Sequence, residues 1–447
     1  MNNGKFRKAL CLFTVPALLS AMLLPSCMAA PTEISSSLSE ETAVTSETTT
    51  ETSETTVVTT ATTSAEITEE TTAAATTEES SAISSETTAA IPSGDELNKL
   101  KNVGGNIWIN EDPQYSAIVN ELLAQTQNGT VTGSFVVAND TDIIFAAGKG
   151  ILDNNGNEVT PYTTYEAGSI SKSFAAVCIL KLAEEGKLSL KNTLGEFFPE
   201  YNYCQRYDKN SKITVNDLLY MRSGIPGDPL KFFGADLALE LIQDENRTPD
   251  EKQRAFYKKV EGKIYMECLF TCELESEPGT KYQFTDANYY VLAAIVEDVT
   301  GKPYEEYVNE VILKPCAMAN SSSMSYGDVN AQLPKDTFYN PFEGSKGSAD
   351  IHSSAIDILK YDRALFGGKI LKPDSLKTLL TPADLYSCGW NIETDGLIHN
   401  EGDTYAFHAH NYVFDNNGKR YYVIAFTVIG DKSPENIWKS ISPVLGK

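Results

Sequence analysis

The chain has 447 residues, a formal net charge of −25 and a hydrophobic content of 41%. Such an acidic chain lacks the basic face that nucleic-acid binding requires, so we expect no nucleic-acid partner. Among its eight cysteines, Cys268 and Cys272 lie one helical turn apart, but no second close pair completes a zinc-binding spacing. We therefore expect neither a metal nor a cofactor.

Residues 1–27 are typical of an export signal, with a positively charged start followed by an apolar run at 9–24. The segment Leu24-Pro-Ser-Cys27 resembles a bacterial lipoprotein cleavage box. Lipidation of Cys27 would tether the protein to the membrane through this anchor alone. Ordinary signal cleavage after Ala30 is the alternative. In either case we expect a protein at the bacterial cell surface, membrane-tethered or secreted.

Residues 28–94 are dominated by Thr, Ser, Glu and Ala. Between 31 and 93 there is no Lys, Arg or aromatic residue, whereas 12 Glu residues supply almost half of the formal charge. Such a segment buries too little apolar surface to offset its chain entropy, so we predict a disordered stalk. The net charge is therefore partly a property of the tether and says little about the substrate.

The folded domain is predicted at 95–447, with helical periodicity through its middle and strand signals at its two ends. Helices are expected at 113–127, 174–185, 213–221, 288–300, 303–313, 353–366 and 433–445. Hairpins are expected at 133–149, split by Asn139-Asp140, and at 405–429, split by Asp415-Asn-Asn-Gly418. Cys178 is expected to be a buried thiol inside its helix.

The simplest arrangement of these elements joins both hairpins in one antiparallel sheet, with the terminal helices packed on it. We therefore predict an α+β (mixed α/β) fold. Its sheet lobe would comprise 107–168 and 384–447, and its helical lobe 169–383. A cleft between two lobes is a common place for a substrate site.

The most informative motif is Tyr165-Glu-Ala-Gly-Ser-Ile-Ser-Lys-Ser-Phe174, at the start of a predicted helix. Ser169 and Lys172 are three residues apart and share a helix face, so the lysine amine can reach the serine hydroxyl. A serine becomes a good nucleophile when a nearby base takes its proton, and a helix N-terminus stabilises a developing oxyanion. The motif indicates a serine acyl-enzyme hydrolase, although a capping serine beside a surface lysine has the same spacing.

Four segments together resemble the serine β-lactamase-related family, which includes class C β-lactamases and penicillin-binding-protein-like serine hydrolases. They are the Ser169–Lys172 motif, 213–225, 278–292 and 353–381. The resemblance extends from about residue 130 to 430. It implies a β-lactamase/transpeptidase-like fold, with an antiparallel sheet flanked by helices plus a helical lobe. It also implies attack by Ser169 on an amide or ester in a small-molecule or cell-wall peptide substrate, with Lys172 as the base.

The family's second motif, Tyr-x-Asn, aligns with Phe284-Thr285-Asp286. Phenylalanine has no proton to transfer, whereas positioned acid–base groups typically contribute ~100- to 10,000-fold. The resemblance places Asp286 among the substrate-binding residues, in place of an amide, where its negative charge would lie near Lys172 and weaken it as a base. Tyr282 is the candidate substitute for the missing proton shuttle, because residues two apart in an extended segment point the same way.

The family's third motif, Lys-Thr-Gly or His-x-Gly, aligns with His399-Asn-Glu-Gly402, which has one extra residue. The resemblance implies that His399 and Gly402 face the site from the wall opposite Ser169. It also implies that the N–H of Asp403 completes an oxyanion hole with that of Ser169. A histidine in a surface turn is the alternative. His408 and His410 alternate on a predicted strand, but the sequence shows no third metal ligand.

Two functions follow from these observations. The first is an exported, surface-tethered serine hydrolase that forms an acyl-enzyme. The second is a catalytically degenerate family member that binds ligands at the cell surface, which the loss of the phenol at Phe284 and the irregular third motif favour. An idle pocket in a wall-associated structural protein is a third interpretation.

Overall fold

The computed structural model describes residues 96–150, 158–235, 237, 259–260, 262–323, 346–404, 407–428 and 431–446. The predicted export signal, Cys27 and the stalk lie outside these ranges. Within them, no helix combines the length and the apolar character that crossing a membrane requires.

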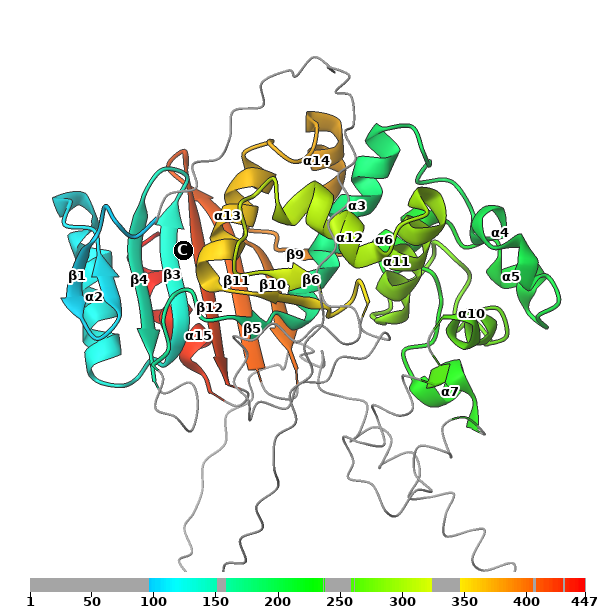
Figure 1. The fold of residues 1–447 in the computed structure, drawn as a ribbon, viewed down its shortest axis with the longest axis horizontal. Helices are drawn as coiled ribbons and strands as arrows, with labels where there is room; N and C mark the ends of the chain where they lie inside the picture. The colour runs from blue at the N-terminus through cyan, green and yellow to red at the C-terminus, as the bar shows by residue number, and fades with distance from the viewer. Residues whose placement is uncertain are drawn as a thin grey trace, which may run out of the picture. The chain divides into compact units, whose positions relative to one another are not determined.

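A nine-stranded sheet forms one side of the described domain, at the left in Figure 1, and most of the helices lie at the right. Its order is β1 (Lys101–Gly104), β2 (Ile107–Ile109), β4 (Ile143–Lys149), β3 (Gly133–Asn139), β12 (Lys419–Val428), β11 (Phe407–Asn416), β10 (Ile398–Asp403), β9 (Trp390–Ile392) and β8 (Tyr386–Ser387). All neighbouring strands are antiparallel. β12 pairs with β3, so the two predicted hairpins share one sheet, and the predicted fold class is confirmed.

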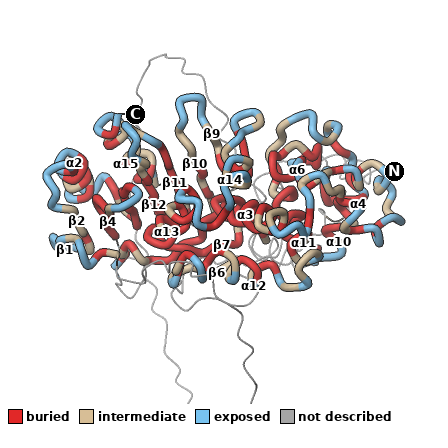
Figure 2. Tube along the Cα trace, turned by 90° about the horizontal axis from the view of Figure 1, so that it is seen from above, coloured by how far each residue is buried: buried red, intermediate tan, exposed pale blue. Residues whose placement is uncertain are grey.

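One face of this sheet is covered by α2 (Ser116–Gln127) and α15 (Ser433–Ile441), which lie side by side (Figure 2). Alternate strand residues such as Phe135 and Val137 pack with Ile437 and Ile441 of α15 in one apolar cluster. The period of two along a strand sends the intervening residues to the other face.

The opposite face is covered mainly by α13 (Ala355–Phe366) and by the turn before α3 (Ser171–Glu184), which belong to the helical part of the chain. The other helices of this part are α4 (Leu194–Phe197), α5 (Tyr207–Asn210), α6 (Val215–Leu219), α7 (Pro229–Phe233), α10 (Lys263–Leu269), α11 (Ala287–Thr300), α12 (Tyr304–Val308) and α14 (Pro373–Leu379). Single turns are η1 (Pro113–Tyr115), η2 (Gly168–Ile170), η3 (Pro199–Tyr201) and the π turn η4 (Asn309–Leu313). α13 was predicted within the helical lobe, but it packs on β3 and β12 of the sheet.

A second, three-stranded sheet supports the turn that carries Ser169. It consists of β5 (Tyr165–Glu166), β7 (Ile351–Ser353) and β6 (Ser322–Ser323). These strands have two or three residues each and are too short for a periodic pattern, so they were not among the predicted elements. α3 then runs through the apolar core, where Cys178 is buried as a free thiol, as predicted.

Candidate active site

Ser169 lies in η2, the turn that leads directly into α3, and its residue is 5% exposed. The turn is held from one side by β7, because Ala167 N donates to Ile351 O at 2.8 Å. From the other side it is held by β10. Gly168 has a φ of +53°, and a Cβ there would meet Gly402 Cα at 2.9 Å. Glycine at 168 therefore allows both the left-handed backbone and the close approach of the two segments.

Lys172 is the centre of the polar contacts around Ser169, and its side chain is 2% exposed. Its Nζ donates to Ser169 Oγ at 2.8 Å and to Ser348 O at 3.1 Å. The same Nζ lies 2.7 Å from Asp286 Oδ1 and 5.0 Å from the centroid of the Phe284 ring. The structure thus brings together Ser169, Lys172 and the two residues aligned with the second family motif.

Asp286 is positioned by the start of α11, for which it is the residue before the first helical turn. Thr285 Oγ1 donates to Pro226 O at 3.3 Å, and Asn288 Oδ1 accepts from Ser223 Oγ at 2.6 Å. These bonds fix the segment that carries Phe284 and Asp286. A buried ammonium group requires partners that compensate its lost hydration, and Asp286 and Ser348 O supply them.

β10 forms the opposite wall of the site through its backbone. A Cβ on Gly402 would lie 2.0 Å from Ala167 O and 3.0 Å from Ser169 N. Thr404 N donates to Phe407 O at 2.9 Å, so the N–H of Thr404 points toward β11. Backbone directions alternate along a strand, and the N–H of Asp403 therefore points away from β11, toward η2. This direction fits an oxyanion hole formed by the N–H groups of Ser169 and Asp403.

The side chain of His399 lies on the other face of the sheet, so the prediction that it faces Ser169 is wrong. His399 is paired across the strands with Tyr412, and the two rings stack with their centroids 5.9 Å apart. Although burial opposes it, the nearby Glu401 and Glu393 carboxylates raise the pKa of His399 above its usual value. The extra residue in the motif reverses the alternation, which is why His399 and Gly402 face opposite ways.

The side chain of Asp403 also lies on the far face, where its carboxylate accepts a hydrogen bond from His408 Nδ1. Only the backbone of Asp403 is directed toward Ser169. The predicted shuttle Tyr282 packs its ring against Tyr386, with centroids 5.6 Å apart. Its role as a proton shuttle stays a prediction.

Asn400 is a further residue of the site that the sequence motif did not indicate. It has the same parity on β10 as Gly402 and is 3% exposed. Its Nδ2 donates to Gly389 O at 3.4 Å, and its Oδ1 has no hydrogen-bond partner within the described residues. Gly389 in turn packs on the backbone of α3, because a Cβ at position 389 would lie only 2.5 Å from Ser173 N. Counting back two residues from Gly402, instead of three, would have identified Asn400.

A buried Ser-x-x-Lys pair at the start of a central helix, beside an antiparallel sheet, defines the class of serine β-lactamases and penicillin-binding proteins. Residues 116–427 match the sequence model of the Beta-lactamase family, which is more than half of the chain. The chain belongs to this family, and with it to the β-lactamase-like serine hydrolase superfamily.

The chain is 28% identical over 287 residues to PbpX of Bacillus subtilis (strain 168), a protein named for the penicillin-binding proteins. That match covers 61% of this chain and 64% of PbpX. Protein flp of Staphylococcus aureus (strain N315) is 28% identical over 49% of this chain and 40% of flp. The chain therefore spans less than two thirds of these curated relatives. The penicillin-binding protein from Bacillus halodurans has the same fold, with a TM-score of 0.58 at 20% identity, covering 72% of this chain and 99% of the other.

Proposed function

We propose that this protein is an exported, surface-tethered serine hydrolase that cleaves an amide or ester through an acyl-enzyme. This proposal depends on one observation, the 2.8 Å hydrogen bond between Lys172 Nζ and Ser169 Oγ, both of which are buried at the start of α3. A nucleophile within hydrogen-bond reach of its base is the geometry that serine activation requires.

In the proposed reaction, Ser169 Oγ attacks the carbonyl carbon and its proton passes to Lys172 Nζ. The carbonyl oxygen becomes an oxyanion, stabilised by the N–H groups of Ser169 and Asp403. The proton then leaves with the amine or alcohol of the substrate, and the acyl group stays on Ser169 Oγ. Attack by water on this ester releases the acid and restores the serine.

Asp286 acts against this reaction. Lys172 can accept the serine proton only as a neutral amine, whereas its 2.7 Å contact with Asp286 is that of an ammonium ion with a carboxylate. Phe284, whose ring centroid lies 5.0 Å from Nζ, supplies no second proton carrier. These two residues favour the second candidate function, a ligand-binding protein that retains the fold and forms no acyl-enzyme. Its ligand would be a small molecule or a cell-wall peptide.

Covalent trapping separates the two candidates. The protein is incubated with a fluorophosphonate or a labelled penicillin, and the adduct is located by intact-mass measurement and peptide mapping. We expect one adduct on Ser169 that disappears in Ser169→Ala and persists in Ser189→Ala, a change at an exposed loop serine. Absence of any adduct on the folded protein at high probe concentration supports the binding function and contradicts the hydrolase. An adduct on another residue contradicts the role of Ser169.

The surface tether is proposed from the sequence of residues 1–94. Lipidation at Cys27 predicts that a Cys27→Ser full-length protein, expressed in a bacterial host, loses incorporation of a labelled fatty acid and leaves the membrane fraction. An unchanged membrane fraction in that variant would contradict lipid anchoring.

A further inference from the structure

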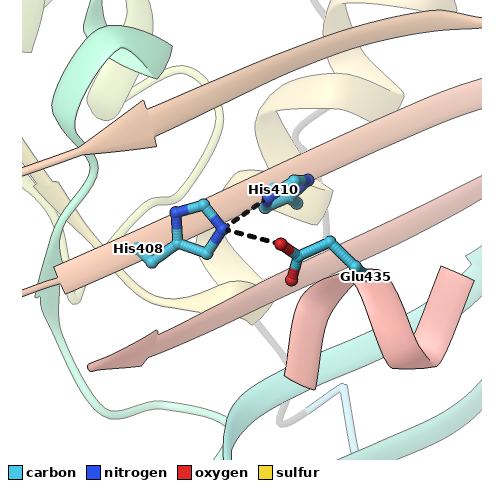
Figure 3. Close-up of side chains that lie close together, drawn as sticks. All are labelled: His408, His410 and Glu435. Carbon is cyan, nitrogen blue, oxygen red and sulfur yellow. Dashed lines mark hydrogen bonds and ion pairs between the residues drawn. The ribbon is translucent and has the colours of Figure 1, made fainter. Parts of the chain in front are cut away.

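We propose that His408, His410 and Glu435 form a binding site for one divalent transition-metal ion of the Zn²⁺ type, on the face of the sheet opposite Ser169. Figure 3 shows the three side chains converging, two from β11 and one from α15. His408 Nε2 lies 2.7 Å from His410 Nε2 and 3.7 Å from Glu435 Oε1. All three ligand atoms lie within 4.8 Å of one another.

The secondary structure explains why these residues meet. His408 and His410 are two apart on β11 and therefore project from the same face of the sheet. Glu435 is in the first turn of α15, which packs on β11 and β12. Ser433 anchors that turn, because its Oγ accepts from Thr132 N at 2.8 Å. The position of α15 is therefore fixed by contacts that do not involve the histidines, and it places the Glu435 carboxylate beside them.

Each histidine has a carboxylate near its other ring nitrogen. His408 Nδ1 donates to Asp403 Oδ1, and His410 Nδ1 lies 3.5 Å from Glu401 Oε1 and 2.6 Å from the Tyr412 hydroxyl. Metal-bound histidines almost always donate their second N–H to such a partner, which fixes the tautomer and orients the ring. With the Nδ1 atoms engaged in this way, both Nε2 atoms can bind an ion once it replaces the 2.7 Å hydrogen bond between them.

The distances are those of a site that needs only a small adjustment to accept an ion. At Zn–N bonds of about 2.0–2.1 Å, two ligands in a tetrahedral arrangement are separated by roughly 3.3 Å. The two Nε2 atoms lie closer than that, so the rings must separate by about half an ångström, and His410 must carry its proton on Nδ1. Glu435 Oε2 is buried and has no hydrogen-bond partner within the described residues, although the whole side chain is 34% exposed.

The ligand set indicates which ion would bind. Two imidazole nitrogens and one carboxylate suit Zn²⁺ and its neighbours Co²⁺, Ni²⁺ and Cu²⁺, whereas Mg²⁺ and Ca²⁺ prefer oxygen ligands throughout. His408 is 14% exposed and His410 is 5% exposed, so water would reach the ion mainly past Glu435 and supply a fourth ligand. A bound ion would join the C-terminal helix α15 to β11 and stabilise that contact.

Zinc titration of the full-length, untagged protein tests the proposal. After removal of metal with a chelator, we expect isothermal titration calorimetry with Zn²⁺ to give one ion per chain and the melting temperature to rise. We expect Co²⁺ to give visible d–d absorption without the intense near-ultraviolet band of a thiolate ligand, because six free cysteines are also present in the described part of the chain. No binding, or a cobalt spectrum with a thiolate band, would overturn the site.

Variants locate the ion. His410→Gln and Glu435→Gln should each weaken Zn²⁺ binding by at least ~100-fold, and Asp403→Asn by ~10- to 100-fold with the cobalt bands retained. His399→Gln is the matched control, because it removes the third histidine on this face of the sheet and should change affinity less than threefold. Binding that survives Glu435→Gln, measured on a variant whose metal-free melting temperature matches the parent, would contradict the proposal.

Discussion

The two faces of β10 differ in the chemistry that they present. On one face, Gly402 brings the strand backbone against Ala167 and Ser169, and the site uses backbone N–H groups and a neighbouring helix start. On the other face, the side chains of β10 are charged or ionisable, and Asp403 contacts His408 of β11. Because side chains alternate with a period of two, shifting the strand by one residue would exchange the two faces. The register of β10 therefore decides which of its residues lie beside Ser169 and which lie beside His408 and His410.

The two faces also differ in how they hold charge. Lys172 is buried on the serine face and is compensated by one carboxylate at 2.7 Å and one carbonyl oxygen at 3.1 Å. On the histidine face, Glu401, Asp403 and Glu435 surround two imidazoles. The first arrangement disfavours a base, whereas the second favours a bound cation. Activity at Ser169 and ion binding at His408 should therefore respond to different substitutions.

The largest effect is expected from Gly402→Ala. Its Cβ would lie 2.0 Å from Ala167 O, a backbone atom that cannot move without displacing the turn that holds Ser169. Loss of one oxyanion donor typically costs ~100- to 1,000-fold, so we expect the rate of covalent trapping at Ser169 to fall by at least ~100-fold. Glu401→Ala, the adjacent residue with its side chain on the other face, should change that rate less than threefold. Equal loss in both variants would contradict the proposed division between the faces.

A smaller effect, of opposite sign, is expected from Asp286→Asn. Removing the carboxylate breaks the ion pair that competes with transfer of the serine proton to Lys172 Nζ, and we expect trapping at Ser169 to accelerate by about 10-fold. Phe284→Tyr in the same background should add a further ~10-fold by restoring a proton carrier near Nζ. Lys172 loses an ionic partner, so unfolding should become easier by about 1–2 kcal/mol, a value reduced because Asp286 is 40% exposed.

Stopped-flow or quenched trapping measures this second prediction, with Glu273→Gln as a control for loss of one exposed carboxylate. Slower trapping in Asp286→Asn would mean that Asp286 positions Lys172 for catalysis instead of opposing it. Unchanged trapping in the double variant would mean that position 284 contributes no proton transfer.

Local patterns predicted much of this molecule. Helix α3, the Ser169–Lys172 pair and the shared sheet of the two hairpins follow from periodicity and short spacings, because neighbours along a helix or strand are set by geometry alone. Phe284 and Asp286 were aligned by resemblance to the family. The direction of His399 was not predicted correctly, because it depends on the register of β10 against β11, which an extra residue in the motif obscured.

Long-range contacts were the part that the sequence did not reveal. Glu435 is 25 residues from His410 along the chain, and only the packing of α15 on the sheet brings it to the two histidines. Asn400 was overlooked because its neighbour His399 is the more reactive residue type, although its buried position beside Gly389 is the one on the serine face. Residue type alone therefore identified the candidates, and strand pairing was needed to assign each to a face.

The last effect concerns acid stability on the serine face, where β7 supports the turn of Ser169, and it is expected to leave the chemistry at Ser169 unchanged. Burial raises the pKa of Asp350 from 3.8 to about 6, even though Ser323 donates to its carboxylate. Burial also lowers the pKa of His352 from 6.5 to about 4, with Glu166 at 4.0 Å. Asp350 binds its proton more tightly when folded, so it stabilises the fold below pH 3.8 and that contribution is lost as the pH rises through about 6.

His352 has the opposite sign, because its stabilisation is complete above pH 6.5 and is lost as the pH falls through about 4. Between about pH 4 and pH 6.5, the changes in stability from Asp350 and His352 therefore offset each other in the parent protein. Asp350→Asn removes one of them, and a shift of about two pKa units corresponds to at most about 3 kcal/mol. We expect this variant to be more stable than the parent at pH 7.5, by about 1–3 kcal/mol, and equal to it near pH 4.

Urea unfolding at pH 7.5, 5.5 and 4.0 checks this prediction, with the exposed Asp374→Asn as the matched control. In Asp350→Asn the stabilising protonation of Asp350 no longer offsets the destabilising protonation of His352. The free energy of unfolding of this variant should therefore fall more steeply on acidification than that of the parent, and adding His352→Gln should reduce that dependence on pH. A uniform gain at all three pH values would show that the amide improves packing instead of removing a titrating group. Asp350 and His352 flank Ile351, whose backbone is hydrogen-bonded to Ala167 and Ser171 beside the site. In these variants we therefore expect the rate of trapping at Ser169 to change with pH only at pH values where the fold itself is lost.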